Sequence, residues 1–187
     1  MGRTAGRGAG DTQRLVLEAA SEVFRTRGTG ATLDDVAQQA GVSKGGLVYH
    51  FPSKDALVQA LVGAMLEEFR AAVHACLDPD DDRPGRLVRA YVRASLSAPD
   101  TGEAREASAL IAQLITAPAV ADVARADVVR WKDDFAADGL PADVVTLVVS
   151  AADGASVAPL WGAGLDDDAR ERLVDRLLRL TVDSTSA

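Results

Sequence analysis

The chain has few of the residues on which most enzymes and disulfide-rich proteins depend. Cys76 is the single cysteine, so no disulfide can form within the chain. It lies two residues from His74, and on a helix that spacing points the two side chains apart, which rules out a nucleophile–base pair. No Cys/His spacing suggests zinc, and no glycine-rich phosphate loop or GxSxG motif is present. The sequence therefore predicts no enzyme, no metal and no cofactor.

Aromatic residues and long apolar runs are also scarce. The 187 residues include four Phe, two Tyr and two Trp, although 48% are hydrophobic. Ala, Val and Leu must then fill the core, which favours helices over sheets. No uninterrupted apolar run approaches the roughly 18 residues of a membrane span. The N-terminal MGRTAGRGAG lacks the apolar segment of a secretory signal. We expect a soluble, all-α, cytoplasmic protein with no membrane partner.

The net charge of −8 is unevenly distributed. Residues 1–57 carry seven basic and six acidic groups, whereas the remainder carries 13 and 22. The acidic part would repel nucleic acid, so only a local face of the N-terminal part can meet DNA. Residues 1–10 are predicted to form a disordered basic arm. Arg3 and Arg7 could reach a DNA minor groove, although an inert tail is the simpler interpretation.

The stretch from Thr32 to Leu57, TLDDVAQQAGVSKGGLVYHFPSKDAL, has the most distinctive pattern in the chain. Small Ala37 allows two helices to approach closely. Gly41 follows four residues later, where a turn with positive φ favours glycine. Apolar Leu47 comes six residues after that and faces inward. This spacing is typical of a helix-turn-helix, the unit that places a helix in the DNA major groove.

The same residues resemble a known family. GVSKGGLVYHFPSKDAL resembles the DNA-binding domain of tetracycline-repressor-type (TetR family) regulators, and VLEAASEVFRTRG with GATLDDVAQQA is similar to the family's preceding helices. The match covers residues 12–57, and Gln13 departs from it where a basic residue is expected. The resemblance implies a three-helix DNA-binding head, residues 11–52, and a helical body of effector binding and dimerisation, residues 53–187. About nine helices are expected in total.

The short helix from Ser43 to about Tyr49 is the predicted recognition helix. Gly45 and Gly46 each cost about 1 kcal/mol relative to alanine inside a helix. The functional interpretation is that they let the backbone approach DNA; the alternative is that the turn tolerates them. Near the base edges we expect Ser43, Lys44, Gly45 and Gly46, and near phosphates Thr32, Tyr49, His50 and Lys54. Thr32 is also expected to cap its helix together with Asp35. A cation in the first turn opposes the helix dipole, so Lys54 is better explained by a facing phosphate than by solvent.

Helical periodicity continues through the body. It predicts helices over residues 12–27, 54–77, 86–97, 103–116, 120–137, 141–161 and 167–180. The acidic clusters 80–82 and 166–168 lie in predicted loops and are expected to be solvated. The 141–161 helix is apolar nearly all round, so we expect it to be covered on every side.

The family resemblance further implies an effector cavity in the body and a dimer made by the last two long helices. The candidate cavity residues are Leu66, Phe69, Tyr91, Gln113, Leu114, Trp131, Phe135, Ser150 and Asp153. The candidate dimer residues are Val148, Ala151, Ala155, Trp161, Leu173 and Leu177. Asp153 either orients a ligand or makes a structural bond, across the dimer or to an Arg or Tyr side chain. The structural role is preferred.

These patterns predict a homodimeric transcriptional regulator, most simply a repressor, on a palindromic double-stranded DNA operator. The expected effector is small and apolar or amphipathic. One alternative is a DNA-binding regulator without a small-molecule inducer. Another is a helical binding protein or enzyme that has lost DNA function, against which Gly41, Lys44, Tyr49 and Lys54 argue.

Overall fold

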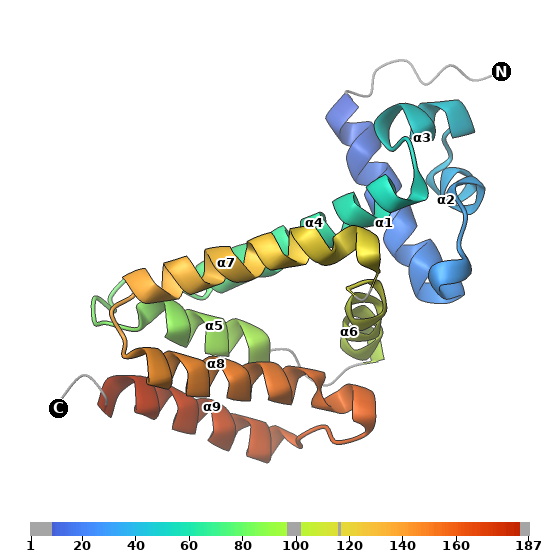
Figure 1. Cartoon of the computed structure of the whole chain (residues 1–187). Helices are drawn as coiled ribbons and strands as arrows, with labels where there is room; N and C mark the ends of the chain where they lie inside the picture. Colours follow the sequence, from blue (N-terminus) through green and yellow to red (C-terminus); the bar gives the residue numbers. More distant parts are fainter. Residues whose placement is uncertain (1–8, 97–101, 116, 184–187) are drawn as a thin grey trace. The chain divides into compact units, whose positions relative to one another are not determined.

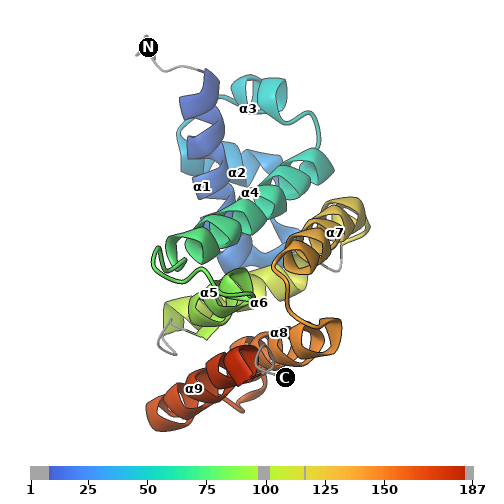
Figure 2. The same ribbon diagram turned by 90° about the vertical axis from the view of Figure 1, so that its left-hand side faces the viewer.

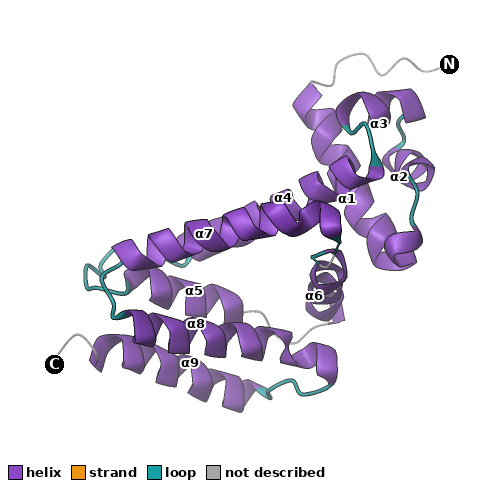
Figure 3. Ribbon diagram, viewed as in Figure 1, coloured by secondary structure: helices purple, strands orange, loops and turns teal. Residues whose placement is uncertain are grey.

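The computed structural model describes residues 9–96, 102–115 and 117–183 of the chain. Over these ranges the protein is helical and contains no strand (Figures 1 and 3). The α-helices are α1 (Ala9–Arg27), α2 (Leu33–Ala40), α3 (Lys44–His50), α4 (Lys54–Ala75), α5 (Arg86–Leu96), α6 (Gly102–Leu114), α7 (Ala121–Ala137), α8 (Ala142–Val157) and α9 (Asp167–Asp183). The 3-10 turns are η1 (Gly28–Gly30), η2 (Pro118–Val120) and η3 (Ala158–Trp161). The predicted all-α class is confirmed.

Most helix ends agree with the sequence to within a few residues. Ala9 and Gly10 are helical although they belong to the predicted disordered arm, which is therefore wrong at these two positions. The rest of that arm, including Arg3 and Arg7, lies outside the described residues. The helix predicted over 141–161 remains α-helical only to Val157 and then tightens into η3. Pro159 explains the change, because its nitrogen has no proton to donate to an α-helical hydrogen bond.

The chain divides into two compact units, which are described separately below. Unit 1 comprises Met1–Met65 with Leu110–Ala124, and unit 2 comprises Leu66–Ala109 with Arg125–Ala187. The division falls inside α4 rather than between residues 52 and 53, where the sequence suggested it. Leu57 and Leu61 of α4 are buried, so the first half of that helix belongs to the core of unit 1.

Unit 1 contains the three helices of the DNA-binding head. Helix α1 packs on α2, and α2 contacts α3. Their buried apolar side chains include Val16, Ala20, Phe24, Val36, Ala37, Leu47 and Phe51. Because α3 is short, its position depends on Leu47 and on Phe51, which ends the helix.

Unit 2 is built around α5, α8 and α9, each of which contacts the other two. Helices α8 and α9 lie side by side (Figures 1 and 2). Val92 of α5, Val148 of α8 and Leu177 of α9 are buried together in one hydrophobic core. The aromatic side chains of Tyr91, Trp131 and Phe135 belong to the same core.

Among the described residues, only one side of helix α8 is covered. Val148 and Ala152 are fully buried, whereas Leu147 is 58% exposed. Ala142–Trp161 is long and apolar enough to cross a membrane by length and composition, as the core helices of soluble proteins also can be. Polar residues such as Thr146 interrupt its apolar runs.

Candidate DNA-binding surface and effector cavity

The first turn of α2 is held by a reciprocal pair of hydrogen bonds. The Asp35 N–H donates to the Thr32 hydroxyl at 3.2 Å, and the Thr32 N–H donates to the Asp35 carboxylate at 2.9 Å. Hydrogen bonds from Thr32 hold the pKa of Asp35 below its usual value, and Arg27 adds to the effect. The predicted capping pair is confirmed. The Thr32 residue stays exposed at the same helix end.

Gly41 makes the turn between α2 and α3. Its φ of 64° and ψ of 30° are left-handed, and its N–H donates to the carbonyls of Ala37 and Gln38. A β-carbon at Gly41 would meet no atom within 4 Å, so glycine is required there by backbone conformation rather than by space. The predicted turn glycine is confirmed, and Ala37 is buried as the close helix approach requires.

Helix α3 buries one side and exposes the other. Leu47 is fully buried, whereas Tyr49 is 83% exposed and Lys44 and Gly45 face solvent. The Gly46 N–H donates to the Ser43 hydroxyl at 3.1 Å, so Ser43 caps the helix. Sequence reasoning placed Ser43 at the bases and missed this capping role, which its position before the helix could have indicated.

Each of the two lysines of the predicted DNA-binding site contacts a side chain of the DNA-binding head. Lys44 Nζ lies 2.9 Å from the Asp34 carboxylate, and both side chains are exposed. Lys54 Nζ lies 5.7 Å from the ring centroid of Phe24. His50 is half-buried, with its ring 5.1 Å from that of Tyr49. Asp34 was not singled out in the sequence, because nothing local shows that it meets a residue ten positions away.

Gly45 has no packing role in the chain itself. A β-carbon added there would meet nothing within 4 Å, whereas one at Gly46 would lie 3.2 Å from the Ser43 oxygen. Alanine would stabilise a helix at Gly45. The absence of a side chain at residue 45 therefore has no explanation inside the described part of unit 1.

A hollow of about 250 Å³ opens in unit 2. It is lined by Tyr91 of α5, by Val128, Trp131, Lys132 and Phe135 of α7, and by Val145, Thr146, Val149, Ser150 and Asp153 of α8. Five of the nine predicted cavity residues are brought together there: Tyr91, Trp131, Phe135, Ser150 and Asp153. The other lining residues were missed because α7 alone does not reveal which of its sides meets α8.

The four remaining candidates do not line this hollow. The Phe69 ring lies edge-on to Tyr91 at a centroid distance of 5.3 Å. Leu66 is half-buried outside it. Gln113 and Leu114 belong to unit 1, where Leu114 is buried.

Asp153 makes a hydrogen bond to a tyrosine, one of the alternatives that the sequence analysis gave for it. The Tyr91 hydroxyl donates to its carboxylate at 2.7 Å. Surrounding protein atoms raise the pKa of Asp153, and the Tyr91 hydrogen bond opposes that effect. Burial, followed by the nearby Asp153 charge, also raises the pKa of Tyr91 well above its usual range. Asp153 nevertheless retains exposed area and lines the hollow, so the hydrogen bond does not remove it from a ligand's reach.

Trp131 also contacts a buried cation. The Arg70 guanidinium lies 3.8 Å from its ring centroid and pairs with Asp127 at 3.1 Å and Asp134 at 2.5 Å. Asp127, Trp131 and Asp134 occupy one face of α7 at i, i+4 and i+7. That spacing was visible in the sequence, but the arginine facing it, 57 residues from Asp127, was not.

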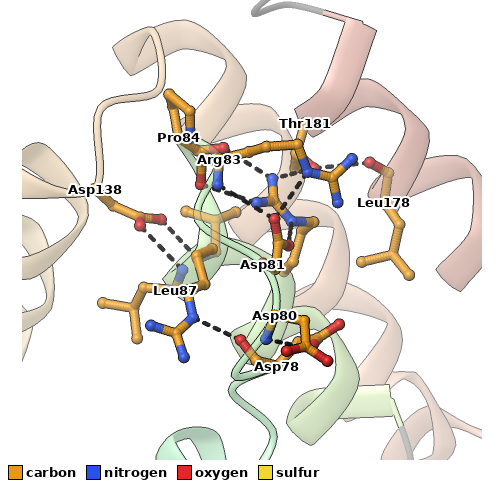
Figure 4. Close-up of polar contacts among 12 residues, drawn as sticks. Asp78, Asp80, Asp81, Arg83, Pro84, Leu87, Asp138, Leu178 and Thr181 are labelled. Atoms are coloured by element: carbon orange, nitrogen blue, oxygen red, sulfur yellow. Dashed lines mark hydrogen bonds and ion pairs between the residues drawn. The ribbon is translucent and has the colours of Figure 1, made fainter.

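The acidic loop before α5 is not uniformly solvated (Figure 4). Asp81 is 5% exposed, and its carboxylate accepts hydrogen bonds from Arg89 at 2.7 Å and from Arg83 at 2.8 Å. The expectation of a solvated cluster at 80–82 is therefore wrong for Asp81. Hydrogen bonds from Arg83, then Arg89, hold the pKa of Asp81 far below its usual range.

The Arg89 guanidinium connects this loop to α9. It donates to the Pro84 carbonyl at 2.9 Å, to the Arg83 carbonyl at 3.0 Å and to the Thr181 hydroxyl at 3.3 Å. Arg89 is nearly fully buried, so these partners replace the water that its charge has lost. The network fixes the start of α5.

Two of the predicted dimer residues are not available to a second copy. Val148 and Leu177 are buried in the protomer's own core, and this corrects their assignment. Ala151, Ala155 and Leu173 are half-buried, and Trp161 is 81% exposed. Leu147 and Val157 of α8 are exposed as well and were not predicted.

Two helices of the chain are joined by a tight turn, and the second of them exposes one side. The chain also contains a helical unit with a hollow. Together these features define a helix-turn-helix transcriptional regulator. Residues 16–61 match the family described as bacterial regulatory proteins, tetR family. Residues 85–182 match the tetracyclin repressor-like C-terminal domain. The chain belongs to the TetR family, whose members are regulators and not enzymes.

Curated relatives align with the N-terminal part. The regulator TtgR of Pseudomonas putida is 35% identical over 82 residues, which is 43% of this chain and 39% of that protein. The regulator RutR of Escherichia coli K12 is 35% identical over 85 residues, 45% of this chain and 39% of that protein. The alignments thus span about two fifths of the relatives' length.

Solved structures match nearly the whole chain. The multidrug binding protein EbrR in complex with malachite green is 25% identical, with a TM-score of 0.67 over 90% of this chain and 97% of that one. A TetR family member from Streptomyces coelicolor A3 is 24% identical, with a TM-score of 0.70 over 91% and 98%. A transcriptional regulator from Pseudomonas aeruginosa PAO1 is 17% identical, with a TM-score of 0.75 over 97% and 93%. The last two show the fold alone.

Proposed function

We propose that this protein is a cytoplasmic homodimeric repressor that binds a palindromic DNA operator and releases it when a small ligand occupies unit 2. The observation that carries the proposal is the arrangement of α3, with Leu47 buried and Lys44, Gly45 and Tyr49 exposed. A helix anchored in this way can enter the major groove. Two of them, related by a dimer axis, read two half-sites.

The exposed groups divide by chemistry into base and phosphate contacts. The first turn of α3 presents Ser43, Lys44, Gly45 and Gly46 to base edges. The phosphate contacts come from Thr32, Tyr49, His50 and Lys54. The open space beside Gly45 supports this assignment, because a glycine that the protein does not need for its own packing fits a close approach to DNA.

The exposed face of α8 and η3 supports dimerisation. Leu147, Val157 and Trp161 present apolar surface there. Small Ala151 and Ala155 lie on the same helix and allow a second helix to approach closely. Covering this face with a second copy would remove the apolar surface from water, which stabilises the pair by roughly 25 cal/mol per Å² buried.

The hollow in unit 2 supports a ligand response. EbrR, to which this chain is similar, has been solved with malachite green and with imidazole. A ligand that binds one conformation of the dimer more tightly than the other changes operator affinity by the same free energy. This observation favours the ligand-responsive regulator over a regulator controlled by abundance alone.

Selection of bound fragments from a random double-stranded DNA pool tests the proposal. We expect a palindromic motif with half-site centres about 10 base pairs apart and two protomers per fragment. The Lys44→Ala/Tyr49→Ala double variant, matched for concentration and shown to be folded, serves as the control and should enrich nothing. Enrichment of a non-palindromic sequence by a single protomer, or of no sequence at all, would contradict the proposal.

A further inference from the structure

The hollow in unit 2 has a wall made of three mutually packed aromatic rings. Tyr91 lies edge-on to Trp131 at a centroid distance of 5.1 Å and to Phe135 at 5.4 Å. Trp131 and Phe135 are stacked at 5.3 Å with an angle of 23° between their planes. The volume of about 250 Å³ lies just below the range of about 300–1,000 Å³ found for drug-sized ligands, so the occupant is small.

Asp153 and Lys132 bring one negative and one positive charge to the lining of this hollow. Asp153 is the one carboxylate among the ten lining residues, and it is held toward Tyr91 by the 2.7 Å hydrogen bond. Within the described ranges no basic side chain forms an ion pair with it. Lys132, the basic lining residue, is exposed on α7. Asp153 is also exposed, so a ligand in the hollow can reach its carboxylate, and the Tyr91 hydrogen bond fixes that carboxylate beside the aromatic wall, where it can pair with a cation.

One ring of the aromatic cluster, Trp131, already contacts a cation. Arg70 stacks over Trp131 at 3.8 Å, and its charge is matched by Asp127 and Asp134 rather than by Asp153. Aromatic rings attract cations through their negative faces. The same cluster therefore presents apolar surface to a second cation, with the Asp153 carboxylate beside it.

We propose that the effector is a small lipophilic organic cation, an amine or quaternary ammonium carrying an apolar group. Its positive centre lies against Asp153, and its apolar part lies against Phe135 and Val149. This assignment rests on the proposed function, in which the hollow is the effector site. A phenylalkyl anion that bound through Lys132 and a neutral molecule of the same shape are the competing occupants.

Three phenyl probes of one shape separate these classes: benzyltrimethylammonium as the cation, neopentylbenzene as its neutral carbon isostere, and phenylmethanesulfonate as the anion. The chain has two tryptophans, so Trp161→Phe in the full-length protein leaves Trp131 as the single fluorescent indole. We expect saturable quenching of Trp131 by the cation at concentrations at least tenfold below those needed for either other probe. Equal or tighter binding of the neutral or anionic probe overturns the proposal, as does the absence of saturable binding of the cation.

Asp153→Asn, made in the same background, removes the charge and keeps an oxygen that can accept the hydrogen bond from the Tyr91 hydroxyl. It should weaken the cation at least tenfold and change the neutral probe by less than twofold. Asp143→Asn is the matched control on the same helix, because Asp143 is exposed and does not line the hollow. If Asp143→Asn weakens the cation as much as Asp153→Asn does, the effect is long-range charge and the Asp153 assignment is wrong.

Release of operator DNA by the cation is measured separately, by the anisotropy of a labelled duplex. Binding that depends on Asp153 without DNA release supports the cation site and refutes the proposed ligand response. DNA release by the neutral or anionic probe, independent of Asp153, supports a ligand response and refutes the cation site.

Discussion

The Lys44 ammonium lies 2.9 Å from the Asp34 carboxylate, so the basic group of the recognition helix is paired with the first turn of α2. Both side chains are exposed, and an ion pair of this kind is weak enough for a phosphate or a base edge to replace Asp34. If Lys44 contacts DNA as proposed, Asp34 opposes that binding twice, by holding Lys44 and by repelling phosphates.

We predict that Asp34→Asn strengthens binding to any DNA by about two- to fivefold at low salt, with a smaller effect at high salt. Fluorescence anisotropy on operator and scrambled duplexes measures it. Asp175→Asn, the same charge change on α9, controls for net charge. Weaker binding by Asp34→Asn would show that Asp34 positions Lys44 instead of restraining it.

Gly45→Ala separates the two interpretations of the glycine pair. Because a β-carbon there meets nothing within 4 Å, the folded protein should gain about 0.5–1 kcal/mol in its free energy of unfolding. Operator affinity should fall about tenfold or more, since the new methyl group meets DNA. Urea unfolding and anisotropy measure the two effects. A stabilised protein with unchanged affinity would mean that the turn merely tolerates glycine.

Lys54→Ala and Tyr49→Phe should weaken binding to all DNA sequences alike, while Lys44→Ala should also relax base preference.

Losing one phosphate contact at Lys54 lowers the slope of log affinity against log salt by about 0.9. Lys54 also lies over the Phe24 ring, so unfolding is measured in parallel and Lys54→Arg serves as the charge-preserving control. An unchanged affinity and salt slope in Lys54→Ala would remove Lys54 from the phosphate contacts.

Asp81→Asn breaks the buried pair with Arg89. Leaving that guanidinium buried without its partner charge should lower the free energy of unfolding by about 3–5 kcal/mol at pH 7. The pKa of folded Asp81 lies below that of the unfolded chain, so its contribution is complete above about pH 4 and declines as the pH falls further. The difference between Asp81→Asn and wild type should therefore shrink at pH 3. Exposed Asp82→Asn should change stability by less than about 0.5 kcal/mol, and an equal loss there would contradict the assignment.

Leu147→Glu tests the proposed dimer face. Leu147 is exposed on α8, so a single protomer should tolerate the change, whereas a dimer that buries it should dissociate. Sedimentation velocity should show a dimer for wild type and a monomer for the variant. Val129→Glu, an exposed apolar position on α7, is the control and should remain dimeric. A dimeric Leu147→Glu would place the interface elsewhere.

The features that could be predicted from sequence are local. Gly41 and the Thr32–Asp35 pair depend on residues within four positions, and their geometry agrees with the prediction. The order of the helices was predictable for the same reason, since caps, prolines and apolar periodicity lie within each segment.

The features that escaped prediction join distant segments. Asp81 was expected in solvent because the loop sequence is acidic, but it pairs with Arg89 of α5, which in turn donates to Thr181 of α9. Val148 was assigned to the dimer because the family resemblance implies that the last two long helices pair there, and periodicity cannot say which side of the apolar α8 meets α5. The hollow contains five of its nine predicted residues. Gln113 and Leu114 belong to unit 1, and the sequence does not show which side of α4 faces α7 and α8, so Leu66 and Phe69 were assigned to the hollow as well.

Fluorescence anisotropy on the DNA immediately upstream of this protein's own gene, repeated across salt concentrations, tests the central claim most directly. We predict tight binding that exceeds binding to a scrambled duplex, saturates at two protomers per site and weakens steeply with salt. Weak binding that is equal on both duplexes at every salt concentration would contradict a sequence-specific dimer acting at its own promoter.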